Sequence, residues 1–91
     1  MTASRPLFLR AAVATQQRDY PSAARDLQAL LKISPQHVNG RLSLAIVTQK
    51  MGRPREALNA LNLLVQSAPG NADCLAARAD VEVELGMDEA A

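Results

Sequence analysis

Few residues of this 91-residue chain carry side chains that catalysis or metal binding requires. His37 is the only histidine and Cys74 the only cysteine. A catalytic histidine works beside a nucleophile or a carboxylate, and no recognisable motif places one next to His37. A zinc site needs more His or Cys ligands at close spacing than Cys74 has around it. We therefore interpret His37 as a surface turn residue and Cys74 as a partly buried small hydrophobic residue.

Three acidic residues near the C-terminal end could be mistaken for a catalytic carboxylate pair. On a helix, Asp80 and Glu84 share a face, whereas Glu82 lies elsewhere. No acid–base partner accompanies them, so we interpret this face as solvated. The four glycines are isolated from one another and form no phosphate-binding loop. The sequence therefore predicts a protein that is not an enzyme and that binds neither a cofactor nor a metal.

Apolar residues recur at helical spacing along the chain and predict an all-α fold. They are mainly Ala, Leu and Val, with only Phe8 and Tyr20 as aromatic residues, which favours closely packed helices over a sheet. Prolines begin or end several of the helices. The expected helices cover about residues 4–17, 21–33, 38–51, 54–67 and 72–85. The third is apolar almost all round, so we expect it to be buried on more than one side.

The whole pattern recurs after 34 residues. Small residues stand where two helices would cross closely, and leucines stand where neighbouring hairpins would pack. The equivalent positions are Ala11, Ala45 and Ala79; Ala23, Ala57 and Ala91; Leu27 and Leu61; Leu30 and Leu64; Pro35 and Pro69; and, in the turn, Arg18, Gly52 and Gly86. Since no single hairpin buries its own apolar face, the stacking of hairpins must supply the core.

This pattern resembles the tetratricopeptide repeat, which has 34 residues, two antiparallel helices, alanines at its eighth and twentieth positions and a proline near its end. The resemblance implies a single domain over 1–91, with repeat one at 4–37, repeat two at 38–71 and a partial third repeat or capping helix at 72–91. It further implies antiparallel helix hairpins stacked as a right-handed α-solenoid. Because the last residues reproduce the start of another second helix, we favour a piece of a longer chain over a capping helix with a short tail.

The resemblance also implies a concave face lined by the first helix of each repeat. The peptide-binding residues that it assigns to this groove are Arg5, Phe8, Leu9, Asn39, Leu42, Ser43, Ile46, Gln49, Lys50, Asp73 and Asp80, and Ala12, Thr15 and Gln16 share the face. Some family members hold a terminal carboxylate with Lys and Asn at the fifth and ninth positions, which are apolar in both full repeats here. An apolar floor suits an amphipathic helix or an extended apolar peptide. The alternative is that these side chains only pack between hairpins.

Charge is distributed unevenly along the chain. The formal charge is +1 in total, but residues 1–56 carry about +6 and residues 57–91 about −5. Either these are the solvated faces of helices, or the two ends attract each other or a partner with the complementary charge. The small total charge gives no reason to expect nucleic acid as a partner, and no apolar run reaches the roughly 20 residues that span a membrane.

We therefore predict a protein–protein interaction module, a scaffold or chaperone-like adaptor whose groove binds a protein or peptide partner. The alternatives are the N-terminal portion of a larger enzyme such as a transferase, or an assembly protein that forms a homo-oligomer through its exposed ends. A single cysteine fits a reducing compartment, so we expect a cytoplasmic location. Arg10 interrupts the apolar run that a signal peptide needs, and a mitochondrial presequence is the weaker alternative.

Overall fold

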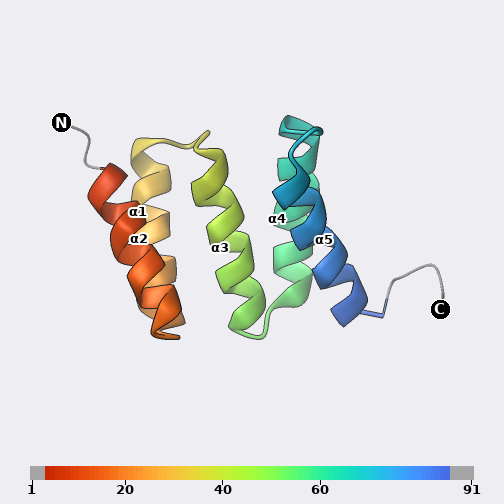
Figure 1. Cartoon of the computed structure of the whole chain (residues 1–91), viewed down its shortest axis with the longest axis horizontal. Helices are drawn as coiled ribbons and strands as arrows, with labels where there is room; N and C mark the ends of the chain where they lie inside the picture. Colours follow the sequence, from red (N-terminus) through yellow and green to blue (C-terminus); the bar gives the residue numbers. More distant parts are fainter. Residues whose placement is uncertain (1–3, 87–91) are drawn as a thin grey trace.

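The computed structural model describes residues 4–86, which form five α-helices (Figure 1). The helices are α1 (Ser4–Gln16), α2 (Tyr20–Ile33), α3 (Val38–Lys50), α4 (Pro54–Ser67) and α5 (Ala72–Glu84). Each helix packs on the next one along the chain, and α3 also contacts α5. The stack measures 47 × 27 × 17 Å, with α1 and α2 at one end of its long axis and α4 and α5 at the other (Figure 1). The predicted all-α helical repeat fold is confirmed.

The helix ends follow from prolines and capping side chains. Pro21 and Pro54 stand in the first turns of α2 and α4, where the helix has no use for the N–H that proline lacks. Asn71 caps α5, because its side chain accepts a hydrogen bond from the backbone N–H of Cys74 at 3.1 Å. None of the described helices has the length and apolar character that crossing a membrane requires.

The core consists of two clusters of buried side chains that meet at α3. The first contains Ala11, Ala14, Ala23, Leu27, Leu30 and Val47. The second contains Leu42, Ala45, Ala57, Leu58, Leu61, Leu64, Cys74, Ala77 and Val81. Helix α3 contributes Val47 to the first cluster and both Leu42 and Ala45 to the second. The expectation that this helix is buried on more than one side is therefore confirmed.

Alanines are buried where the two helices of each hairpin pack together. Ala11 and Ala23 are 2% and 0% exposed in the first hairpin, and Ala45 and Ala57 are 1% and 0% exposed in the second. A larger side chain at these positions would push the helices apart. Ala79 occupies the same repeat position on α5 and is exposed. No described helix follows α5 to cover it.

The turn after each first helix contains one residue in the left-handed region. Gly52 has φ +84°, Gly86 has φ +71° and Arg18 has φ +60°. Glycine adopts this conformation at little cost, whereas a residue with a Cβ atom is strained by about 1–2 kcal/mol. A Cβ atom added at Gly52 would meet nothing within 4 Å, so the cost there comes from the backbone alone.

Exchanging the residue types between these two turns should change stability in opposite directions. We expect Arg18→Gly to raise the free energy of unfolding by about 0.5 kcal/mol, because relief of strain exceeds the added chain entropy of the unfolded state. We expect Gly52→Arg to lower it by about 1–2 kcal/mol. Urea unfolding followed by circular dichroism measures both changes. Equal stabilities of both variants and the wild-type protein would contradict the strain argument.

Candidate functional site

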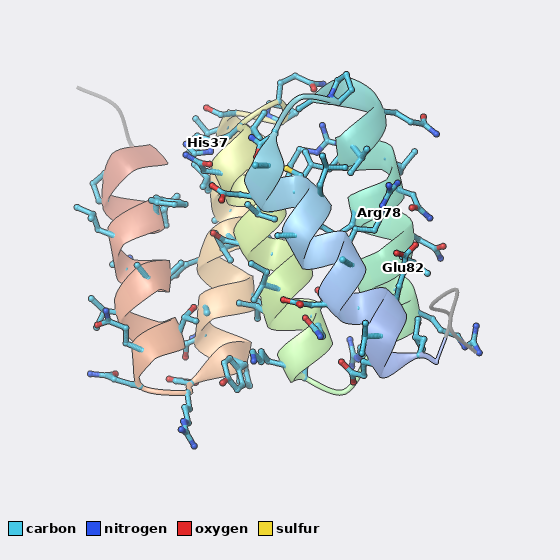
Figure 2. The ribbon with its side chains drawn as sticks, turned by 45° about the vertical axis from the view of Figure 1, so that its right-hand side comes forward. His37, Arg78 and Glu82 are labelled. Atoms are coloured by element: carbon cyan, nitrogen blue, oxygen red, sulfur yellow. The ribbon has the colours of Figure 1, made fainter. Side chains whose placement is uncertain are left out.

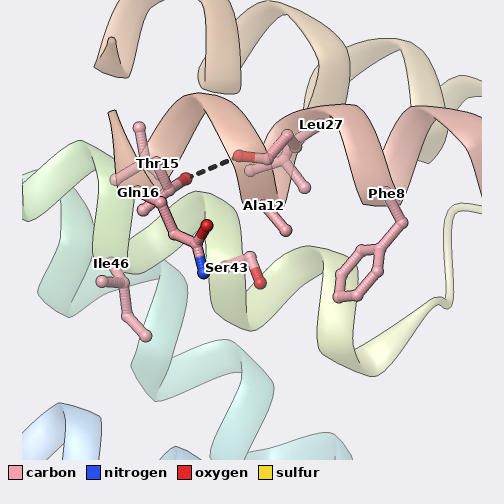
Figure 3. Close-up of a pocket in the computed structure, with 9 residues that line it drawn as sticks. Phe8, Ala12, Thr15, Gln16, Leu27, Ser43 and Ile46 are labelled. Carbon is pink, nitrogen blue, oxygen red and sulfur yellow. Dashed lines mark hydrogen bonds between the residues drawn. The ribbon is translucent and has the colours of Figure 1, made fainter. Parts of the chain in front are cut away.

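A groove of about 310 Å³ lies between α1 and α3 (Figure 3). Its lining residues are Phe8, Ala11, Ala12, Thr15 and Gln16 from α1, Leu27 from α2, and Ser43, Ile46 and Val47 from α3. The volume is at the lower end of the range for ligand sites, roughly 300–1,000 Å³. It is large enough for apolar side chains of a peptide, and its open side allows the rest of the peptide to remain at the surface.

The floor of this groove is apolar and its edges are polar. Leu27 is fully buried and Val47 nearly so, while Phe8 and Ile46 are half-buried and Ala12 is exposed. Ala11 is buried in the floor as well, and the other lining side chains, from Thr15, Gln16 and Ser43, carry hydroxyl or amide groups. An apolar floor with a few polar groups at its rim is the usual composition of a site that recognises an apolar peptide segment.

The rim hydroxyl on α1 is held by its own helix. Thr15 Oγ1 donates a hydrogen bond to the carbonyl oxygen of Ala11 at 2.8 Å, which Figure 3 shows as a dashed line. With its hydrogen engaged, this hydroxyl presents only acceptor lone pairs to the groove. Gln16 and Ser43 lie beside Ala12 in the same view. The amide of Gln16 is exposed and offers both donors and an acceptor to a peptide backbone.

The structure brings together three residues of the predicted peptide-binding set, Phe8, Ser43 and Ile46, and the three residues predicted to share their face, Ala12, Thr15 and Gln16. Leu42 is 9% exposed and belongs to the second core cluster, so it supports the groove from within the core. The other predicted residues do not line this groove: Leu9, Asn39, Lys50, Asp73 and Asp80 are exposed at the surface, and Gln49 is half-buried. The side chain of Arg5 lies outside the described part of the structure.

Gln49 has a partner on the neighbouring helix. Its side-chain amide donates a hydrogen bond to Glu84 Oε1 at 2.7 Å, which joins α3 to α5. A charged acceptor makes this a stronger bond than one between neutral groups. The amide is thus engaged in holding two first helices together, and the open part of the concave face lies between α1 and α3.

Three lining residues were not among those predicted, namely Ala11, Leu27 and Val47. The repeat register assigns Ala11 and Leu27 to contacts between helices, and the structure confirms that they are buried. They reach the groove because it is shallow, so that its floor is the outer surface of the first core cluster. A core position beside the gap between two first helices is the signal that identifies them.

A second hollow of about 460 Å³ lies between α2 and α4 and is lined mainly by those helices and by α3. It is more polar than the first, because Arg41, Arg53 and Glu56 reach it beside apolar residues such as Leu63. Charged side chains lose hydration when a peptide covers them, and this opposes binding unless each finds a partner. The groove between α1 and α3 is therefore the better candidate for an apolar ligand.

His37 anchors one end of the groove. Its Nδ1 atom accepts a hydrogen bond from the backbone N–H of Gly40 at 2.8 Å, so the imidazole caps α3. Its ring lies 5.5 Å from that of Phe8, centroid to centroid, at an angle of 36°. The side chain is half-buried at the α2–α3 turn (Figure 2). The interpretation as a plain surface turn residue thus missed both its cap and its contact with the groove.

The described residues contain no metal-binding cluster, and their one cysteine is buried. No group of three or more His, Cys, Asp or Glu residues within 4–86 is placed to hold a metal ion. Cys74 is fully buried, and burial first, then the charge of Asp73, raises the pKa of its thiol, with Arg41 acting in the opposite direction. A buried thiol with a raised pKa is a poor nucleophile. Cys74 is therefore a core residue.

Arg78 and Glu82 lie on the same side of α5, facing the edge of α4 (Figure 2). Both side chains are half-buried. Within residues 4–86 the ion pair that the structure contains is Arg10 with Asp26, at 3.4 Å. Asp26 is 8% exposed, so Arg10 compensates the charge of a buried carboxylate on α2.

A family model described as "Tetratricopeptide repeat" matches residues 14–91. The match covers most of the chain and includes α2 to α5. A search of curated proteins finds no match.

The cap at His37 can be separated from its ring contact by two substitutions. We expect His37→Ala to lower the free energy of unfolding by about 1 kcal/mol, since the N–H of Gly40 loses its acceptor. We expect His37→Asn to keep most of that stability, because Asn71 caps α5 at the same repeat position. Thermal unfolding at matched protein concentration measures both. If the asparagine variant is as unstable as the alanine variant, the contribution comes from the contact with Phe8 and not from the cap.

Proposed function

Because the chain belongs to the tetratricopeptide repeat family, whose repeats generally mediate protein–protein interaction, we propose that it binds an apolar peptide segment of a partner protein in the groove between α1 and α3. The segment would be an amphipathic helix or an extended strand that inserts apolar side chains. The observation that carries this proposal is the apolar floor of the groove, with Phe8 and Ile46 half-buried at its surface.

Burial of apolar surface supplies the affinity in this proposal. Each 100 Å² of apolar area removed from water contributes about 2.5 kcal/mol, before the cost of ordering the peptide is subtracted. Phe8 is expected to lose little conformational entropy on binding, because its contact with His37 already restricts its ring in the free protein. A side chain that is already ordered loses less entropy on binding.

Charge on the helices beside the groove gives the peptide a preferred direction. Asp80 and Glu84 are exposed on α5, whereas the exposed Arg10 on α1 is already paired with Asp26. A peptide with basic residues near α5 would be favoured over the reverse orientation, through charge complementarity that acts more on specificity than on affinity.

The role that follows is that of a scaffold or chaperone-like adaptor. Tetratricopeptide repeats are a non-catalytic module, so binding is the function we assign to residues 4–86. If these repeats are part of a larger enzyme such as a transferase, the same groove would present a protein substrate to it. Both versions require a peptide in the groove and are tested by the same substitution.

Filling the groove should abolish binding without unfolding the protein. Ala12 is exposed in the middle of α1 and lines the groove, so Ala12→Arg places a long charged side chain over the apolar floor. We expect this variant to lose the proteins that the wild-type chain captures from its source cell, as identified by mass spectrometry, and to reduce by at least tenfold the affinity for the isolated partner.

Ala60→Arg is the matched control. Ala60 is also an exposed alanine inside a helix, but it lies on α4 beside the second hollow. This variant should capture the same proteins as the wild type, and circular dichroism should show the same helical content for both variants. Undiminished capture by a folded Ala12→Arg variant would exclude the groove as the binding site.

A further inference from the structure

The two ends of the helix stack expose apolar faces. At one end, Pro6, Leu9 and Val13 lie on one side of α1, with Leu9 63% and Val13 52% exposed; we term this the α1 end face. At the other end, Leu75, Ala76, Ala79 and Val83 lie on one side of α5, with Leu75 39% and Val83 61% exposed; we term this the α5 end face. Figure 1 shows that α1 and α5 lie at opposite ends of the long axis.

The repeat register shows that the positions of the α1 end face are used for packing elsewhere in the molecule. Val13 is equivalent to Val47 and Val81, which are 1% and 0% exposed against the preceding hairpin. Leu9 is equivalent to Ala77, which is 9% exposed. Leu9 is therefore larger than the alanine that this fold buries at its repeat position, and Val13 is the same residue type as the two valines buried at its position. Within the described structure both side chains are exposed to solvent on α1.

The centre of the α5 end face is also a packing position. Ala79 is equivalent to Ala11 and Ala45, each of which is buried against the second helix of its own hairpin. A small residue there lets another helix approach closely, and Leu75 and Val83 extend the apolar stripe by about one turn on either side. The α5 end face thus has the composition of a helix-packing surface.

The charges around the two faces are complementary. Helix α1 contains Arg5 and Arg10 and no acidic residue, and although Arg10 pairs with Asp26 of α2, residues 4–37 together keep a formal charge of +3. Helix α5 contains Asp73, Asp80, Glu82 and Glu84 against the single Arg78. A basic helix and an acidic helix attract each other, whereas two copies of α5 would repel. Charge therefore favours contact between unlike ends and disfavours a symmetric pair of α5 helices.

We propose that copies of this chain associate head to tail, with the α1 end face of one copy seated on the α5 end face of the next. This goes beyond peptide binding, because neither end face includes the groove between α1 and α3. The contact uses different surfaces on the two copies, so each added copy leaves one α1 end face and one α5 end face free. The product is an open chain of copies whose length grows with concentration.

Sedimentation velocity on the 91-residue chain tests the proposal, from about 10 µM to about 1 mM and at about 0.05 M and 0.5 M NaCl. We expect the weight-average mass to rise continuously with concentration at low salt and to fall towards that of the monomer at high salt. Leu9→Glu and Val83→Lys each replace an exposed apolar residue by a charge opposite in sign to that of its helix, so each alone should give a monomer. Leu63→Glu, at a leucine 58% exposed on α4, is the control and should associate like the wild type.

Mixing the two blocked variants gives the sharpest result. Leu9→Glu keeps an intact α5 end face and Val83→Lys an intact α1 end face, so the mixture should form 1:1 dimers that grow no further. Circular dichroism confirms that each variant is folded, and Val13→Glu replaces Leu9→Glu if that variant loses its helical signal. A wild-type monomer under all conditions, association that survives Leu9→Glu, or a mixture that remains monomeric would each overturn the proposal. Peptide binding in the groove is tested separately, by comparing capture by the wild type and by Ala12→Arg. A negative result for head-to-tail association therefore leaves the groove proposal intact.

Discussion

The rest of the structure depends on the burial of α3 between two cores. Val47 packs into the first core cluster, while Leu42 and Ala45 pack into the second. Neither hairpin of the stack could bury its apolar face alone, and α3 is the element through which each completes the core of the other. At its start the packing is tight, because a Cβ atom on Gly40 would lie 2.8 Å from Cδ2 of Leu30 and would force that side chain to move.

The position of α3 also determines the groove. With α3 held against α2, the gap between α1 and α3 stays open over Leu27, and Ile46 and Ser43 form its second wall. His37 links the two walls of the groove, since it caps α3 through Gly40 and contacts the ring of Phe8 on α1. Residues that stabilise the fold and residues that shape the binding surface are therefore neighbours in space, although the groove itself needs only an open apolar floor.

Much of the fold could be predicted because the same pattern of alanines, leucines and prolines occurs in more than one repeat. Apolar residues at helical spacing predicted the helices, and the almost uniformly apolar third helix predicted that α3 is buried on more than one side. The groove was harder to predict, because position in the repeat does not determine exposure. Phe8 and Leu42 occupy the same repeat position, yet Phe8 is half-buried at the groove and Leu42 lies in a core to which Cys74, Ala77 and Val81 of α5 contribute. Residues of α5 pack around Leu42, whereas the gap between α1 and α3 leaves Phe8 partly exposed.

The chain contains two isoleucines, Ile46 in the groove and Ile33 exposed at the end of α2, and this allows a direct measurement. In a sample with labelled isoleucine methyl groups, each residue gives one δ1 methyl signal in an NMR spectrum. On titration with a peptide of the captured partner, we expect the Ile46 signal to shift and saturate while the Ile33 signal stays in place. A peptide that binds and leaves the Ile46 signal unmoved would contradict binding in the groove between α1 and α3.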